Sequence, residues 1–130
     1  DLPPERHEAH AQDAFAYLEA AQKHNKQFDL IVVDPPSFAP SHDALEKGYH
    51  AYVSLFAHAA RVITSPGILA LASCSSHVTS ELFVEIAVEA VEKEKKRARI
   101  LGVHGQPLDH PFPLACRELQ YLKFLLLEIW

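Results

Sequence analysis

The sequence contains no methionine, only two cysteines and no long apolar run. Cys74 and Cys116 lie far apart and without metal-ligand spacing, so neither a disulfide framework nor a zinc site is favoured. No apolar stretch approaches the roughly eighteen residues that a membrane-spanning helix needs, and the N-terminus lacks the pattern of a signal peptide. These absences predict a soluble, cytoplasmic protein with free thiols, no metal site and no membrane partner.

The chain also lacks a positive net charge, because its formal charge is −5 at pH 7. Phosphate contacts need clustered Lys and Arg, so this segment is not predicted to bind nucleic acid by itself. Its one basic run, Lys93 to Arg99, lies where a helix is predicted to end, and a solvated terminus that complements the helix dipole is the better interpretation. The absence of methionine indicates a processed chain or a fragment.

A Gly-rich phosphate loop is missing as well, since neither G-x-G-x-x-G nor a P-loop occurs among the 130 residues. What the chain does contain is an alternation of strand and helix patterns. Apolar residues at helical spacing predict helices over 14–26, over 43–63 and from Thr79 onward. Apolar runs predict strands over 28–34 and 68–72, and Ser65-Pro66-Gly67 before the second of them is predicted to turn the chain.

This alternation predicts an α/β fold with parallel strands and right-handed crossovers. The first strand shows no polar alternation, which is typical of burial on both faces. The rhythm then changes, because strands are predicted over 98–104 and 121–130 with a Pro-rich loop between them and no helix. The sheet is therefore expected to finish in an antiparallel hairpin, and 48% hydrophobic residues are consistent with a single core.

Two polar clusters follow the predicted parallel strands. The first begins at Asp34 and continues through Pro35, Pro36, Ser37 and Phe38, and the second is Ser73-Cys74-Ser75. Ligands bind at the carboxyl ends of strands in open α/β sheets, so both clusters are candidate site residues on the same edge. The alternatives are an Asp that caps a turn and a small buried Cys.

These segments resemble the large-subunit rRNA cytosine-C5 methyltransferases, a family of class I, Rossmann-like enzymes that use S-adenosyl-L-methionine (SAM). The resemblance rests on FDLIVVDPPSF, on GYHAYVSLFAHAARVITSPGILALASCSSHV, on DHPF and on the terminal YLKFLLLEIW. It covers nearly the whole chain. It implies that residues 1–130 are the C-terminal part of a three-layer αβα methyltransferase domain, with parallel strands and a terminal antiparallel hairpin.

The resemblance also implies roles for the two clusters. Cys74 would be the nucleophile that adds to C6 of the cytosine, which makes C5 reactive toward a methyl group. Asp34 would hydrogen-bond N3 or the exocyclic amine and would also belong to the cofactor site. Pro35, Pro36, Ser37 and Phe38 would bind the target base, with Phe38 stacking on it or on an adjacent base.

Upstream, QDAF resembles the segment that contacts the adenine of the cofactor, which points to Asp13 and Phe15. Asp13 also stands where an N-cap would be, and the two interpretations are equally supported. Tyr49, Ser75 and His77 lie close to the site in the family pattern, and for each a packing or capping role is favoured. Lys123 within YLK is compatible with packing or with a phosphate contact.

The chain differs from complete members of this family in three features that it lacks. The Gly-rich strand-loop, the acidic residue after the second strand and an RNA-binding domain are all absent. We therefore expect rRNA to be bound through the full-length protein and expect the chain alone to bind SAM weakly and to be inactive. The exposed edge of the first strand predicts a possible homodimer. Two alternatives remain: a base-nitrogen RNA methyltransferase of the same fold, and a truncated, non-catalytic module for binding or assembly.

Overall fold

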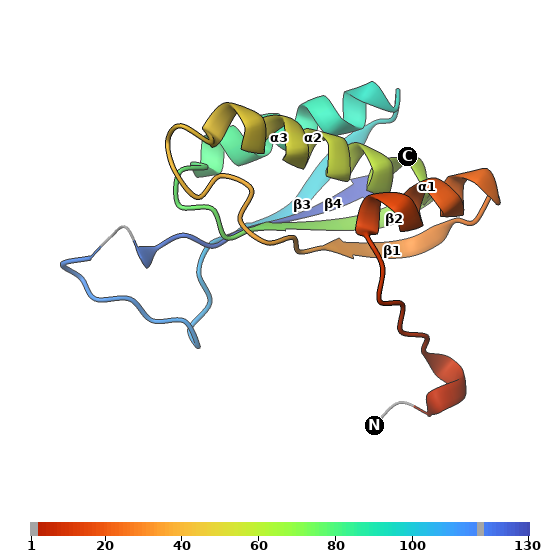
Figure 1. Cartoon of the computed structure of the whole chain (residues 1–130), viewed down its shortest axis with the longest axis horizontal. Helices are drawn as coiled ribbons and strands as arrows, with labels where there is room; N and C mark the ends of the chain where they lie inside the picture. Colours follow the sequence, from red (N-terminus) through yellow and green to blue (C-terminus); the bar gives the residue numbers. More distant parts are fainter. Residues whose placement is uncertain (1–2, 117–118) are drawn as a thin grey trace.

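The computed structural model describes residues 3–116 and 119–130, and its elements alternate as the sequence predicts (Figure 1). A 3₁₀ helix and three α-helices accompany four strands. Their bounds are η1 Pro4–Arg6, α1 Ala14–Lys23, β1 Phe28–Val33, α2 Leu45–Arg61, β2 Ile63–Ser73, α3 Ser80–Lys93, β3 Ala98–His104 and β4 Lys123–Ile129.

The four strands form one sheet in the order β1-β2-β4-β3. β1 and β2 are parallel, with Val33 paired with Leu71, and the connection through α2 is the predicted βαβ unit. β4 lies between β2 and β3 and is antiparallel to both of them. The predicted terminal hairpin of β3 and β4 is therefore confirmed, and its second strand brings Lys123 next to Ser73 at the end of β2.

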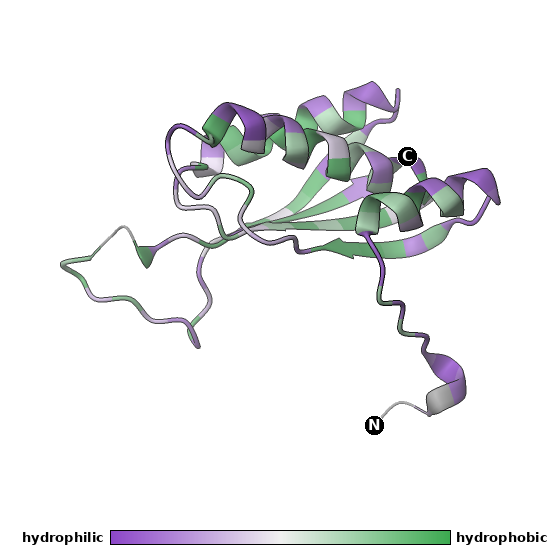
Figure 2. Ribbon diagram, viewed as in Figure 1, coloured by the Kyte–Doolittle hydropathy of each residue, from purple (hydrophilic) through white to green (hydrophobic). Residues whose placement is uncertain are grey.

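All three α-helices lie on one face of the sheet (Figure 1). Apolar side chains of the strands and helices meet there in a single core, and Figure 2 shows the hydrophilic side of each helix turned away from the sheet. Fully buried members of this core include Tyr52, Phe56, Phe83, Leu69, Leu71, Ile86, Leu125 and Ile129. The described residues thus form the sheet and one helical layer of the expected three-layer arrangement.

The opposite face of the sheet is open within the described residues. Leu30 and Val32 of β1 are 57% and 62% exposed, whereas Val33, which points to the helices, is buried. The prediction that this strand is buried on both faces is therefore wrong for the described chain, because no element of residues 3–116 or 119–130 packs on the second face.

β2 is longer than its apolar run predicts. It begins at Ile63 and continues through Ser65-Pro66-Gly67, which the sequence indicates as a turn. Phe28 pairs with Ile63 and Leu30 with Ile68, so the extra residues of β2 are accommodated by an irregularity in the register. This is the physical reason why the predicted turn does not end the strand.

Helix ends follow the capping chemistry of the sequence. Asp13 accepts a hydrogen bond from the Ala16 amide at 2.9 Å, and Thr79 accepts one from the Leu82 amide at 3.1 Å. α2 has no side-chain cap and begins at Leu45, two residues later than predicted. Of the described helices, none combines the length and the apolar character that a membrane crossing requires.

Candidate functional site

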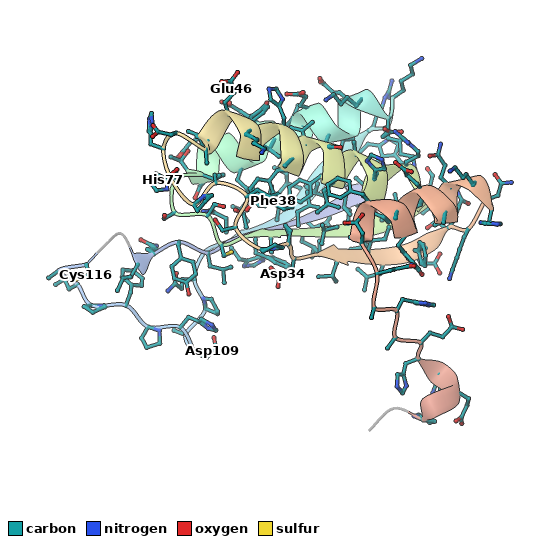
Figure 3. All side chains as sticks on the ribbon, in the orientation of Figure 1. Asp34, Phe38, Glu46, His77, Asp109 and Cys116 are labelled. Atoms are coloured by element: carbon teal, nitrogen blue, oxygen red, sulfur yellow. The ribbon has the colours of Figure 1, made fainter. Side chains whose placement is uncertain are left out.

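The two predicted polar clusters lie at the same end of the sheet, where the carboxyl ends of β1 and β2 meet. We call this end, with the loops that follow the two strands, the carboxyl edge. Because β1 and β2 are parallel and Val33 pairs with Leu71, the residues that follow them leave the sheet side by side. Asp34 comes directly after β1, and Cys74 directly after β2. In Figure 3, Asp34 lies at the end of β1 and Phe38 lies between the following loop and the helices. The fold thus brings together the two segments that the sequence separates by about forty residues.

Asp34 is the exposed acid of this edge. Within the described part of the chain, its carboxylate has no hydrogen bond or ion pair. Of the residues after it, Pro35 is buried, whereas Pro36 and Ser37 are exposed. A stiff backbone with a buried proline therefore supports a carboxylate that remains available to a ligand.

Phe38 is half-buried and packs inward. Its ring centroid lies 4.8 Å from that of Tyr52 in α2, and its backbone N–H donates to the Tyr52 hydroxyl at 3.5 Å. In this arrangement the ring anchors the loop to α2. Base stacking by Phe38 remains a prediction, and it would use the part of the ring that is still exposed.

Cys74 is half-buried and stands between two buried serines, Ser73 and Ser75. Lys123 lies beside this segment, in register with Ser73, and its ammonium donates to the carbonyl oxygens of Ser75 and Tyr121. Burial lowers the pKa of Lys123 to about 8, and the charge of Cys74 acts in the opposite direction. The edge therefore places a buried cation beside the candidate nucleophile.

A network of hydroxyl groups joins the two loops. Ser75 Oγ lies 2.8 Å from Ser37 Oγ and 2.8 Å from the Tyr52 hydroxyl, and it accepts the Ala39 amide at 3.3 Å. Ser73 donates to the Tyr52 hydroxyl at 3.0 Å. Tyr52, Ser73 and Ser75 are fully buried, so the network is shielded from competing water. It fixes the loop after β1 against the loop after β2.

Gly48 in α2 makes this junction possible. A Cβ atom there would lie 2.6 Å from the Phe38 carbonyl oxygen and 2.8 Å from the Ala39 Cβ. Glycine inside a helix costs stability relative to alanine, so its position requires another reason, which is the close approach of the loop. Sequence reasoning missed both Gly48 and Tyr52 as site-supporting residues. The signals were a glycine within a helical pattern and a phenol on the apolar helical face, opposite a serine cluster.

Asp13 is the N-cap of α1 and Phe15 lies in the first turn of this helix. Asp13 caps this helix through its contact with the Ala16 amide, which supports the capping interpretation. Phe15 is half-buried and meets the ring of His58 edge-on, with the ring centroids 5.7 Å apart. Contact of either residue with an adenine remains a prediction.

A role for Asp34, Asp13 and Phe15 in one side of a SAM site remains a prediction. Asp34 supplies a free carboxylate at the edge of the sheet, and Asp13 and Phe15 are the further residues that the sequence indicates for the adenine. The four glycines of the chain lie at 48, 67, 102 and 105, and none belongs to the loops that follow β1 and β2. Among residues 3–116 and 119–130, no group of three or more His, Cys, Asp or Glu residues is placed to hold a metal ion.

Comparison with known proteins identifies the fold first. The chain superposes on a candidate SAM-dependent methyltransferase from Streptococcus mutans with a TM-score of 0.71 and 22% identity, over 90% of the chain and 29% of that protein. It also superposes on SMU.776, a candidate methyltransferase crystallised with S-adenosylhomocysteine (SAH), with a TM-score of 0.66 and 24% identity, over 90% of the chain and 30% of that protein. The fold is the Rossmann-like fold of SAM-dependent methyltransferases.

The sequence comparison indicates a more specific group of proteins than the structural comparison does. The chain is 35% identical over 117 residues to ribosomal RNA large subunit methyltransferase I of Tolumonas auensis, and 32% identical over 121 residues to the protein of that name from Shewanella denitrificans. These matches cover 90% and 93% of the chain. The expected resemblance to large-subunit rRNA methyltransferases is confirmed. The chain spans about 30% of the length of each relative, and no family model matches it.

Proposed function

We propose that this chain carries the target-base side of a SAM-dependent methyltransferase that modifies C5 of a cytosine in large-subunit rRNA. One observation supports the proposal above others: Cys74, Lys123 and the free carboxylate of Asp34 gather at the carboxyl edge of a methyltransferase sheet. The similarity to large-subunit rRNA methyltransferases supports the substrate class. The remaining parts of the cofactor site and the RNA-binding surface belong, in this proposal, to other segments of a longer protein.

The chemistry at C5 requires a nucleophile such as Cys74. C5 of cytosine does not attack a methyl group readily until a nucleophile has added to C6. Addition of the Cys74 thiolate forms a sulfur–carbon bond and places the electron pair on C5. SAM, when bound, supplies the methyl group and leaves as SAH. Loss of the C5 proton to a base then returns its electron pair to the ring and expels the thiolate.

The neighbouring residues assist particular atoms in this proposal. Lys123 places its ammonium beside the Cys74 segment, where it donates to the Ser75 carbonyl oxygen. Asp34 orients the base by accepting a hydrogen bond from the exocyclic amine, or it shares a proton with N3, where negative charge develops during attack at C6. The buried Pro35 holds the backbone beneath this carboxylate.

The acidic composition of the chain supports the assignment of RNA binding to other segments of a longer protein. Clustered positive charge is needed for a tight grip on phosphates, whereas this chain carries a net charge of −5. The catalytic edge would then approach a nucleotide that another surface has already bound. Cytoplasmic location and an rRNA partner are part of the same proposal.

A base-nitrogen methyltransferase is the second candidate, because an exposed Asp-Pro-Pro loop also suits an exocyclic amine, whose nitrogen needs no activating thiol. Replacement of Cys74 separates the two. In the longest reading frame that encodes this chain, Cys74→Ala is expected to abolish methyl transfer to unmodified large-subunit rRNA, measured with radiolabelled SAM. Full turnover by Cys74→Ala would overturn the C5 mechanism.

Cys116→Ala is the matched control, since Cys116 is the other half-buried thiol of the chain and lies away from the edge. This variant is expected to keep normal turnover. Wild-type protein that neither binds SAM nor methylates RNA would instead favour the third candidate, a non-catalytic module for binding or assembly.

A further inference from the structure

The hydrogen-bond network around Tyr52 has a direction that follows from counting donors and acceptors. A hydroxyl group has one donor hydrogen and two acceptor lone pairs. The Tyr52 oxygen accepts from the Ser73 hydroxyl at 3.0 Å and from the Phe38 amide at 3.5 Å, which uses both of its lone pairs. Its own hydrogen is therefore donated to its remaining neighbour, Ser75 Oγ.

The same count of donors and acceptors gives the direction of the hydrogen bond between Ser75 and Ser37. Ser75 Oγ accepts from the Tyr52 hydroxyl and from the Ala39 amide, so both of its lone pairs are also in use. Its hydrogen must then be donated to Ser37 Oγ, which lies 2.8 Å away. Because Tyr52 and Ser75 are fully buried, water does not offer either group an alternative partner.

The chain of donors ends at Ser37, which is exposed on the loop that follows Asp34. Ser37 Oγ receives a hydrogen bond from inside the protein, and its own hydrogen has no acceptor among the described residues. An exposed hydroxyl is ordinarily free to rotate and to act as donor or acceptor. Here one lone pair of the oxygen is occupied from the buried side, so the hydroxyl offers its hydrogen and one remaining lone pair to the solvent side.

We propose that Ser37 is a substrate-binding donor, held in orientation by Tyr52 and Ser75, that recognises an acceptor oxygen of the nucleotide beside Asp34. This role rests on the proposed function. The acceptor is the O2 carbonyl of the target cytosine or a phosphate oxygen next to it, which share the same hydrogen-bond chemistry. Asp34 and Ser37 would then read complementary groups, with the carboxylate facing the amine and the hydroxyl facing the acceptor.

The test compares substitutions in the longest reading frame that encodes the chain, with unmodified large-subunit rRNA transcribed in vitro as substrate. Ser37→Ala is expected to lower kcat/KM about tenfold or more, in keeping with the loss of one substrate hydrogen bond. Ser76→Ala is the matched control, because Ser76 is an exposed serine of the neighbouring loop whose contact is with His77 at 3.4 Å. It is expected to leave kcat/KM unchanged.

Modified transcripts distinguish the two acceptors. Sulfur is a weak acceptor, so a transcript made with 2-thiocytidine is expected to reduce the difference between wild type and Ser37→Ala if the donor reads O2. A phosphorothioate transcript is expected to reduce the difference if the donor reads phosphate. Persistence of the full difference with both transcripts would overturn the proposal, as would equal kcat/KM of wild type and Ser37→Ala on the unmodified transcript.

Tyr52→Phe tests the orientation separately. It removes the donor to Ser75 and the acceptor of the Ser73 hydroxyl and the Phe38 amide, but it keeps Ser37 and the aromatic ring. It is therefore expected to lower kcat while the KM for RNA changes little. A change in thermal stability alone, with normal kcat, would contradict the positioning role.

If the proposed methyltransferase function is wrong, RNA binding by the same variants still tests the role of Ser37. A protein that transfers no methyl group to RNA, yet binds the transcript more weakly after Ser37→Ala than after Ser76→Ala, would remove the methyltransferase proposal and retain the donor. If the inactive wild type and both of its variants bind the transcript equally well, the proposed donor role of Ser37 is overturned as well.

Discussion

The helix-covered face of the sheet and its carboxyl edge both contain buried side chains, but of different kinds. The covered face packs side chains such as Leu71, Leu125 and Phe83, which need no partner beyond good contact. The edge buries Tyr52, Ser75 and Lys123, whose polar atoms each have a hydrogen-bond partner. Burial of polar groups costs free energy that apolar packing would not, so the comparison indicates that the edge is arranged for chemistry.

This comparison predicts that substitutions will divide into those that reduce activity and those that reduce stability. The largest effect on activity, after loss of the nucleophile, is expected at Asp34. Asp34→Ala should lower kcat/KM by about 100-fold or more, because it removes a group that stabilises developing charge. The free energy of unfolding should change by less than about 0.5 kcal/mol, since the carboxylate is exposed. Asp43→Ala, at another exposed acid, should change neither quantity.

On the covered face, Leu71→Ala should have the opposite profile. Leu71 is fully buried in the core, so the loss of its side chain is expected to cost about 2–5 kcal/mol of unfolding free energy, measured by urea denaturation. Leu108→Ala is the matched control, because Leu108 is fully exposed and should leave stability unchanged. A cost below about 1 kcal/mol at Leu71 would contradict the assignment of the core.

Lys123 is a buried charged residue at the carboxyl edge. Its pKa of about 8 lies below the ordinary lysine value, so the unfolded chain binds more protons than the folded one between about pH 8 and pH 10.5. Stability should therefore rise with pH across this window, by about 2 kcal/mol relative to Lys123→Met, which does not titrate. Urea denaturation at several pH values measures the difference. A flat difference would show that Lys123 is not buried as described.

The ion pair of Arg61 and Glu94 is expected to have a smaller effect on stability, at acidic pH. Hydrogen bonds from Arg61, at 2.8 and 2.7 Å, lower the pKa of Glu94, although burial opposes the shift. This contribution to stability is present above the ordinary glutamate pKa and is lost as pH falls below about 4.5. Glu94→Gln should remove about 1 kcal/mol of acid-dependent stability. The same acid dependence in wild type and variant would contradict the assignment.

The smallest effect is expected on the open face of the sheet. Val32 is 62% exposed, so Val32→Ala should cost less than about 0.5 kcal/mol in this chain. A cost near that of Leu71→Ala, growing with protein concentration, would show that a second copy covers this face. Such a dimer would differ from the one predicted from the sequence, which rests on the exposed edge of the first strand.

Local sequence patterns predicted most of the architecture. Helical spacing and apolar runs depend on a few neighbouring residues, and the rule that parallel strands end on one edge then placed Asp34 and Cys74 together. The Pro-rich loop without a helix predicted the antiparallel hairpin. These inferences needed no knowledge of how distant segments pair.

Features that depend on pairing register were not predicted. β2 extends through Ser65-Pro66-Gly67, because its register with β1 tolerates an irregularity that composition does not reveal. The position of Lys123 depends on β4 lying between β2 and β3. The exposure of Val32 depends on what covers the second face, which an apolar run cannot specify. Ser75 and Tyr52 were recognisable only as polar residues within otherwise apolar or small-residue patterns.

Attack of Cys74 on C6 of a cytosine can be detected with large-subunit rRNA that contains 5-fluorocytidine. After methyl transfer, C5 of this base carries fluorine and a methyl group and has no proton to lose, so the thiol cannot be expelled. We predict a SAM-dependent covalent complex whose attachment site, located by peptide mass spectrometry, is Cys74. Methylation of a ring or exocyclic nitrogen of this RNA without any covalent complex would contradict the claim.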